Sequence, residues 1–205
     1  MTLRQDPLDH VSRETLEALK QYEHLLKKWN PKINLVAPAS LSETWDRHIK
    51  DSAQIFWLAN REAKVWLDFG SGAGFPGLVC ATLAKYEKSK TRFALVESDS
   101  RKCAFLRTVN RELNLNVEIH NQRAEVLTGQ DADIISARAL APLDKLLFFA
   151  QKHMKPTTQM LFPKGQNWAS EKKAAEVNWR FSCVEHPSIT LKEAVVLEIG
   201  DVVHA

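Results

Sequence analysis

Three glycines with a carboxylate on either side are the first residues in this sequence that indicate chemistry. Gly70, Gly72 and Gly74 follow Asp68, and Glu97 ends the next apolar run. Glycines let the backbone turn sharply and approach a ligand closely, because they carry no Cβ. In an open α/β sheet, ligands bind beyond the carboxyl ends of the strands. The segment therefore predicts a ligand-binding loop.

The glycine spacing excludes two common phosphate-binding loops. The dinucleotide fingerprint GxGxxG would need a third glycine where Phe75 stands, and no Walker-type Gly-Lys-Ser/Thr follows. Asp68 would repel a pyrophosphate but suits a cation. S-adenosylmethionine carries an ammonium and a sulfonium without phosphate, so we expect it as the cofactor. Asp68 would face the ammonium, directly or through water, and Glu97 would accept hydrogen bonds from the ribose hydroxyls. As alternatives, Asp68 caps a helix and Glu97 is a solvated strand end.

The methyl acceptor must lie near the end of the fourth expected strand, at residues 136–142. This stretch lacks the Asn/Asp-Pro-Pro-aromatic motif typical of amino-group methylation and the cysteine needed for carbon-5 methylation of pyrimidines. A ring nitrogen such as guanine N7 needs only alignment with the methyl group. Arg138 matches the O6 and N7 acceptors of guanine, and we expect it to orient the base or the cofactor. Residues 122–125, after the third strand, are expected to meet the adenine ring.

Alternating strands and helices must position these residues. Apolar runs predict strands at 65–69, 92–96, 117–120, 133–136, 159–162, 179–184 and 194–199. Between them, helices are predicted at 76–86, 101–113, 142–153 and 168–177. This order predicts an α/β fold whose sheet is mostly parallel, with helices on both faces. The last two strands are close enough in sequence to form a hairpin, so that one late strand runs antiparallel.

The first 62 residues show no such alternation and predict a helical extension packed on a domain of residues 63–205. Residues 12–29 have a helical pattern that we expect to end at Asn30-Pro31. A short extended piece at 33–36 and one or two helices at 42–59 complete the extension.

Composition excludes several classes of protein. A chain of 205 residues with 44% hydrophobic residues predicts one folded domain with a small appendage. Its three cysteines are far apart, so we expect neither a disulfide framework nor a metal site. The first residues do not resemble a signal peptide, and no apolar stretch approaches the length of a membrane span. We expect a cytoplasmic monomer without membrane association. The net charge of +3 does not by itself indicate nucleic-acid binding.

At this level of detail the sequence resembles the RsmG family, also called glucose-inhibited division protein B, over nearly its whole length. Phe75-Pro76-Gly77 after the glycines is the most distinctive part. The other matching residues are Lys28-Trp29-Asn30, Asn34-Leu35, Arg47-His48-Ile49, Asp51-Ser52, Asp68 to Gly74, Arg101-Lys102, Phe105-Leu106, Arg123, Glu125, Ser136, Arg138-Ala139 and Lys164-Gly165-Gln166.

The resemblance implies a Rossmann-like class I methyltransferase that makes 7-methylguanosine in 16S ribosomal RNA, free or in the 30S subunit. It implies a cofactor site lined by Gly70, Phe75, Ala124, Glu125 and Arg138, together with Asp68, Gly72 and Glu97. It also implies that the following basic residues face RNA: Arg101, Lys102, Arg123 and Lys164. The family usually has an arginine just before the last strand, where this chain offers only Lys192 and Glu193. His48 is expected to be structural.

Two other functions fit the same residues. One is a methyltransferase of the same fold that acts on a protein or a small molecule. The other is a nucleotide-binding or RNA-binding module without catalysis. Binding of S-adenosylmethionine separates the last of these from the two enzymes.

Overall fold

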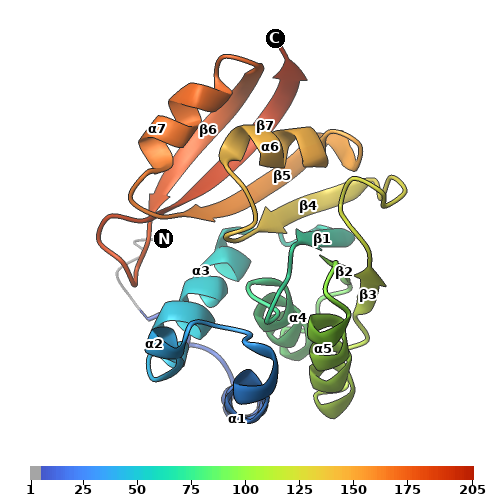
Figure 1. The fold of residues 1–205 in the computed structure, drawn as a ribbon, viewed down its shortest axis with the longest axis vertical. Coiled ribbons are helices and arrows are strands. Elements are labelled where there is room, and N and C mark those ends of the chain that lie inside the picture. Colours follow the sequence, from blue (N-terminus) through green and yellow to red (C-terminus); the bar gives the residue numbers. More distant parts are fainter. Residues whose placement is uncertain (1–5) are drawn as a thin grey trace.

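Seven strands form one sheet in the order β3-β2-β1-β4-β5-β7-β6 in the computed structural model, which describes residues 6–205 (Figure 1). Neighbouring strands from β3 through β5 run parallel, and β7 is antiparallel to both β5 and β6. The strands are β1 (Val65–Phe69), β2 (Arg92–Glu97), β3 (Glu118–Asn121), β4 (Ala132–Ala137), β5 (Met154–Lys164), β6 (Trp179–Pro187) and β7 (Val195–His204). The predicted α/β class, with one antiparallel late strand, is confirmed.

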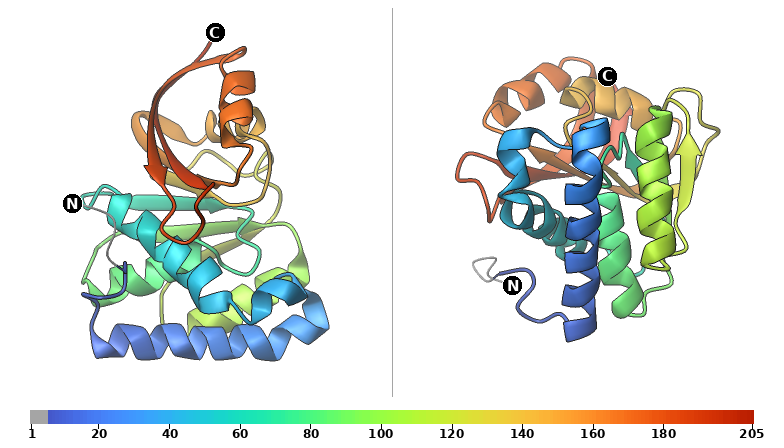
Figure 2. Two further views of the ribbon diagram at one scale, coloured as in Figure 1. Left: turned by 90° about the vertical axis from the view of Figure 1, so that its left-hand side faces the viewer. Right: turned by 60° about the horizontal axis from the view of Figure 1, so that its bottom comes forward.

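Helices cover both faces of this sheet (Figure 2). They are α1 (Arg13–Ile33), α2 (Pro38–Leu41), the π-helix η1 (Trp45–Lys50), α3 (Asp51–Leu58), α4 (Gly77–Tyr86), α5 (Ser100–Glu112), α6 (Leu143–Ala150) and α7 (Trp168–Ala175). One buried cluster joins α1, α3, α4 and α5 to the sheet, and a second joins α6 and α7 to it. The sheet thus separates two hydrophobic cores.

The sheet places Asp68 and Ser136 side by side on neighbouring strands. Asp68 on β1 pairs with Leu95 on β2 and with Ser136 on β4. Both neighbouring strands are almost entirely buried, which accounts for their apolar sequences. The carboxyl ends of β1, β2 and β4 therefore meet at the same edge of the sheet.

The predicted end of the first helix is wrong. Helix α1 continues through Pro31 to Ile33, and Asn34 ends it in the left-handed conformation with φ of 49°. Proline removes only its own N–H, and the last turn is held instead by the Asn34 N–H on the Asn30 carbonyl at 3.0 Å. The Asn30 side chain also accepts from the Val36 N–H at 2.8 Å. The extended piece expected at 33–36 consequently forms no strand.

The N-terminal helices share a core with the sheet domain. Leu19, Tyr22 and Leu26 of α1 are fully buried in the same cluster as Leu78 of α4 and Phe105 of α5. The division at residue 62 stays a prediction, but these contacts make the extension part of one packed unit. Within the described residues, no helix is both long and apolar enough to span a bilayer.

Candidate functional site

The glycine loop between β1 and α4 has a backbone that other residues adopt with difficulty. Gly70, Gly72 and Gly74 have φ of 60°, 55° and 93°. A Cβ on Gly70 would lie 2.7 Å from Leu140 Cδ1, and one on Gly74 would lie 2.6 Å from the Tyr22 hydroxyl. The first and third glycines are therefore required by close packing as well as by backbone conformation.

Asp68 lies fully buried beneath this loop. Its Oδ1 accepts a hydrogen bond from the Ser136 hydroxyl at 2.6 Å, while Oδ2 has no hydrogen-bond partner among residues 6–205. A Cβ on Gly77 would come within 2.8 Å of Oδ2, so this carboxyl also needs a glycine beside it. Burial raises the pKa of Asp68 to about 6, against the opposing effect of the Ser136 bond. The backbone of Gly77, at the start of α4, also lowers this pKa, so the helix-cap alternative stays a prediction.

Glu97, at the end of β2, holds the loop from the other side. Its Oε2 accepts from the Gly72 N–H at 2.9 Å and its Oε1 accepts from the Asp99 N–H at 2.8 Å. The side chain is buried, which excludes the alternative of a solvated strand end. Each carboxylate oxygen has a second lone pair, so Glu97 can still accept hydrogen bonds from a ligand.

A cleft of about 330 Å³ opens in front of the loop, which we call the cofactor cleft. Such a volume is within the range of small-molecule sites. It is lined by Gly70, Gly72, Val96, Glu97, Ser98, Lys102, Gln122, Arg123, Ala124, Glu125, Ala139, Leu140, Lys145 and Phe149. Five of the predicted cofactor residues meet here: Gly70, Gly72, Glu97, Ala124 and Glu125. Asp68 is fully buried rather than on the wall of this cleft.

Phe75 is buried in an aromatic cluster away from the cofactor cleft. Its ring stacks on Tyr22 at 5.4 Å and on His48 at 5.0 Å between centroids, and the Arg138 guanidinium lies 4.9 Å from the ring centre. The Tyr22 hydroxyl also donates to the Ala73 carbonyl. The extension thus supports the glycine loop from behind, a role that the sequence analysis missed.

Arg138 is held by backbone and charge contacts from the extension. It donates to the Arg47 carbonyl at 3.3 Å and lies 3.8 Å from Asp51 Oδ2. Burial lowers the pKa of Arg138, which Asp51 opposes, and burial raises the pKa of Asp51, which Arg138 opposes. Asp51 also accepts from the hydroxyls of Ser188 at 3.3 Å and Thr190 at 3.1 Å. One carboxylate therefore joins Arg138 to the loop between β6 and β7.

A second cleft, of about 570 Å³, adjoins the first, and we call it the acceptor cleft. Its walls come from the extension, from the β4 and β5 ends and from the β6–β7 loop, and include Arg47, His48, Asp51, Arg138, Ala139, Leu140, Lys164, Glu171 and Leu191. Ala139 and Leu140 line both clefts. Ala139 has φ of 55°, an uncommon conformation for alanine that turns the chain where the two clefts meet.

His48 is neutral at the wall of the acceptor cleft. Burial, with Arg138 and Arg47 nearby, lowers its pKa to about 4. Its Nε2 lies 3.2 Å from the Ser40 hydroxyl. These contacts and the stacking on Phe75 support the structural role expected from the sequence.

The basic residues expected to face RNA lie in different surroundings. Arg101 is exposed and pairs with Asp99 at 3.1 Å, while Lys102 and Arg123 line the cofactor cleft. Lys164 is buried, and its ammonium donates to the Ala141 carbonyl at 2.9 Å and to Glu171 at 2.8 Å. Lys192 is exposed beside the last strand. Only Lys164 of this set therefore lines the acceptor cleft.

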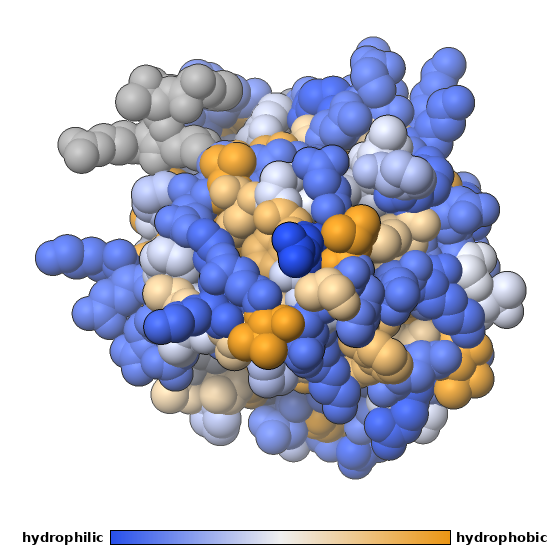
Figure 3. All heavy atoms as spheres, turned by 90° about the horizontal axis from the view of Figure 1, so that it is seen from above, coloured by the Kyte–Doolittle hydropathy of each residue, from blue (hydrophilic) through white to orange (hydrophobic). Residues whose placement is uncertain are grey.

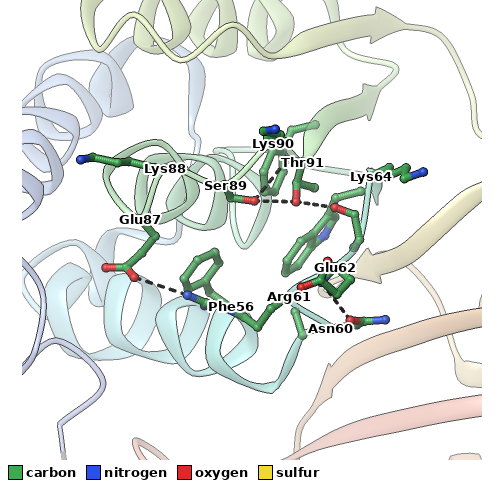
Figure 4. A pocket seen from close by; sticks show the side chains of 14 residues that line it. Phe56, Asn60, Arg61, Glu62, Lys64, Glu87, Lys88, Ser89, Lys90 and Thr91 are labelled. Atoms are coloured by element: carbon green, nitrogen blue, oxygen red, sulfur yellow. Dashed lines mark hydrogen bonds and ion pairs between the residues drawn. The ribbon is translucent and has the colours of Figure 1, made fainter.

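A third cleft lies at the opposite ends of the strands and is a weaker candidate (Figure 4). It is reached from the residues that precede β1 and β2, whereas ligands of such sheets bind at the carboxyl ends. Its polar groups are paired with one another, with Arg61 3.4 Å from Glu87 and Ser89 2.8 Å from Thr91. Lys64 and Lys88 point away from the cavity (Figure 4).

The outer face at the C-terminal end of the molecule shows no large apolar area. Phe148, Val177, Val184 and Val203 are among the large apolar side chains that are exposed in the described part of the chain. Figure 3 shows hydrophilic side chains over most of this face, with small separate apolar patches among them. Isolated apolar residues of this kind are normal on protein surfaces.

Comparison with known proteins identifies close relatives. Residues 15–199 match the model of the GidB family, described as rRNA small subunit methyltransferase G. A ribosomal RNA small subunit methyltransferase G from Cereibacter sphaeroides is 49% identical over 95% of this chain and 94% of its own. A protein of the same name from Ruegeria sp. is 49% identical over 94% of this chain and 93% of its own.

Solved structures of more distant proteins share the fold. A ribosomal protein L11 methylase from Lactobacillus delbrueckii subsp. bulgaricus matches 76% of this chain and 78% of its own, with a TM-score of 0.60 and 14% identity. An O-methyltransferase from Bacillus cereus, solved in complex with SAH, matches 94% of this chain and 93% of its own, with a TM-score of 0.58 and 14% identity.

Proposed function

We propose that this chain, which belongs to the rRNA small subunit methyltransferase G family, transfers a methyl group from S-adenosylmethionine to N7 of a guanine in 16S ribosomal RNA. The family and the fold make it a methyltransferase. The observation that carries the proposal is the junction of the two clefts at Ala139 and Leu140, which puts the cleft that Arg138 lines beside the glycine loop.

The residues that line the cofactor cleft, and Asp68 buried beneath the glycine loop, fit S-adenosylmethionine. Asp68 has a buried carboxylate oxygen without a protein partner, and Glu97 retains lone pairs beside Gly72. A Cβ on Gly70 would collide with Leu140, which lines the same cleft, so any other residue at this position would crowd the ligand region. When bound, this cofactor supplies an electrophilic methyl group on a positively charged sulfur. We infer that Asp68 balances the positive charge of its methionine end and that Glu97 accepts from its ribose.

The acceptor cleft suits a base whose reacting atom already carries a lone pair. The described residues that line either cleft include no cysteine, which disfavours carbon-5 methylation. The guanidinium of Arg138 matches the acceptor edge of guanine, which N7 and O6 form. Its pairing with Asp51 keeps it in one position, and alignment of a lone pair with the methyl group can itself supply several kcal/mol. We infer that Arg138 orients the base.

Ribosomal RNA would contact the cations around these two clefts. Arg47, Lys102, Arg123 and Lys145 line the openings, and Arg101 is exposed beside them. Lys164 uses two of its three N–H donors within the protein, so we infer that it supports the β4–α6 loop and has one donor left for RNA. Binding through phosphates should weaken steeply as salt rises.

Mapping of modified nucleotides tests the proposal directly. Cells that lack the protein should lose one 7-methylguanosine from 16S rRNA, and the wild-type chain should restore it. Gly70→Ile should not restore it, because its Cβ would meet Leu140 at 2.7 Å on a backbone with φ of 60°. Val177→Ala is the control, since this side chain is 75% exposed and lines neither cleft. An unchanged 7-methylguanosine map in the deleted strain would contradict the proposal.

A methyltransferase acting on a protein or small molecule remains the second candidate. It would bind S-adenosylmethionine but bind 30S subunits without the salt dependence of phosphate contacts. A non-catalytic module would not bind S-adenosylmethionine at all. We also propose that the protein acts in the cytoplasm. We propose that it is a monomer, and sedimentation at micromolar concentration tests this oligomeric state.

A further inference from the structure

A short turn forms the part of the cofactor cleft opposite the glycine loop. The Val126 N–H donates to the Arg123 carbonyl at 3.1 Å, which closes a turn over residues 123–126. Ala124 and Glu125 are its two central residues, and both line the cofactor cleft. The peptide unit between them therefore faces the ligand region, and its orientation decides which backbone groups a ligand meets.

The carbonyl of this central peptide is bound from behind by His153. This residue is fully buried in the segment between α6 and β5, and its Nε2 lies 3.3 Å from the Ala124 oxygen. Because that oxygen can only accept, the ring must carry its proton on Nε2. The ring edge packs against Phe69 at 5.3 Å between centroids, at the end of β1. Burial lowers the pKa of His153, so the ring is neutral near pH 7.

The hydrogen bond from His153 to the Ala124 carbonyl also fixes the direction of the Glu125 N–H. Turns of types I and II differ mainly by a flip of the central peptide, which exchanges the directions of its carbonyl and its N–H. The peptide unit is planar, so a fixed Ala124 carbonyl sends the Glu125 N–H in the opposite direction. Within the described chain, no protein group accepts a hydrogen bond from that N–H.

We propose that His153 is a positioning residue for the cofactor, which holds the turn so that the Glu125 N–H can bind the adenine of S-adenosylmethionine. The proposal rests on the proposed function, since it assumes the same cofactor in the same cleft. His153 does not line the cleft itself and acts only through the peptide. The Nε2–H donor of the His153 ring, rather than the size of the ring, holds the turn in place.

Three variants separate the hydrogen bond from packing. His153→Phe keeps an aromatic ring against Phe69 but removes the donor, whereas His153→Gln offers an amide N–H in its place. Lys152→Ala is the matched control, because the Lys152 ammonium reaches the next carbonyl of the same turn, that of Glu125, at 3.4 Å on the exposed side. We expect this exposed bond to contribute little.

Calorimetry with three probes gives the readout: S-adenosylmethionine, S-adenosylhomocysteine and 5′-methylthioadenosine, which keeps the adenine but lacks the amino-acid end. We expect His153→Phe to raise the Kd of all three by about five- to tenfold, the worth of one buried hydrogen bond. His153→Gln should recover most of this loss, and Lys152→Ala should change Kd less than about twofold. The kcat at saturating cofactor and the KM for 30S subunits should stay near those of the wild type.

Several results would overturn the role of His153. They are an unchanged Kd in His153→Phe, a Kd that rises for S-adenosylmethionine but not for 5′-methylthioadenosine, or no recovery in His153→Gln. If His153→Phe fails to fold, His153→Leu takes its place under the same criteria, and a folded His153→Gln must still bind like the wild type. The proposed function fails differently, because then the wild-type chain itself does not bind the cofactor or methylate rRNA.

Discussion

Replacing Asp68 by asparagine should stabilise the protein without cofactor while weakening cofactor binding. The buried carboxyl has its pKa raised from 3.8 to about 6, and Oδ2 has no partner within residues 6–205. Above pH 6 the folded protein therefore carries an ionised group that burial disfavours. A shift of about two pKa units corresponds to roughly 3 kcal/mol of lost stability.

The asparagine does not recover all of this free energy. Its Oδ1 can keep the hydrogen bond from Ser136, but its amide nitrogen takes the place of Oδ2 and stays without a partner. That buried donor costs about 1–2 kcal/mol. The net gain at pH 7.5 should be roughly 1–2 kcal/mol in the free energy of unfolding. The Kd for S-adenosylmethionine should rise about tenfold, because the negative charge beneath the loop that balances the ammonium is lost.

The stability difference between the wild type and Asp68→Asn should depend on pH. A carboxyl whose folded pKa lies above its unfolded value binds its proton first in the folded state. Wild-type stability from this group therefore rises as pH falls from about 6 towards 3.8, while Asp68→Asn lacks this change. Between pH 7.5 and 5 the advantage of the variant should shrink by about 1.4 kcal/mol.

Urea unfolding of both proteins at the two pH values measures this difference directly. Asp133→Asn is the matched control, because desolvation of Asp133 is outweighed by hydrogen bonds from Lys155, Val65 and Lys64, which leaves its pKa lowered. That variant should be less stable than the wild type at both pH values. Our account of Asp68 is refuted if Asp68→Asn is less stable than the wild type at pH 7.5, or if its advantage does not change with pH.

Three further predictions follow from the packing around the loop. Tyr22→Phe removes the hydroxyl that donates to the Ala73 carbonyl. It should lower the free energy of unfolding by about 1 kcal/mol, measured by urea unfolding, and weaken S-adenosylmethionine binding, measured by calorimetry. Asp51→Asn removes the charge facing Arg138, but its side chain can still accept hydrogen bonds from Ser188 and Thr190. The kcat for methylation of 30S subunits should therefore fall with little change in the Kd of the cofactor. An unchanged kcat would contradict this. The pKa of His48 falls to about 4 in the fold, so wild-type stability from this group should be lost as pH falls from 6.5 towards 4, and His48→Gln should show a smaller loss in the same titration.

The sequence predicted those parts of the site whose residues lie close together in the chain or at the ends of neighbouring strands. Asp68 and the glycines belong to one strand and its loop, and Glu97 ends the next strand, so parallel pairing brings them together. The role of residues 124 and 125 as cleft wall followed from the same logic. Phe75 was expected in the cofactor site, but the structure buries it against Tyr22 and His48, and its role toward the cofactor stays a prediction.

The missed residues act across long separations in the chain. Tyr22 reaches Ala73 and Asp51 reaches Ser188, contacts that no periodicity or motif near either residue indicates. His153 follows α6, and only the tertiary fold brings its ring to the Ala124 carbonyl, 29 residues away in the sequence. The prediction at Pro31 was wrong because a proline in the last turn of a helix removes a single hydrogen bond, while the bond from the Asn34 N–H to the Asn30 carbonyl still closes that turn.

The contact between Tyr22 and the glycine loop also links two equilibria. The Tyr22 hydroxyl holds the loop conformation from α1, and we expect a bound cofactor to favour the same conformation, so that each strengthens the other by an equal coupling free energy. S-adenosylmethionine should therefore slow amide hydrogen exchange in α1, although no residue of that helix lines the cofactor cleft. The N-terminal helix would then respond to cofactor occupancy at a distance, and loss of the Tyr22 hydroxyl would lower affinity without removing a ligand contact.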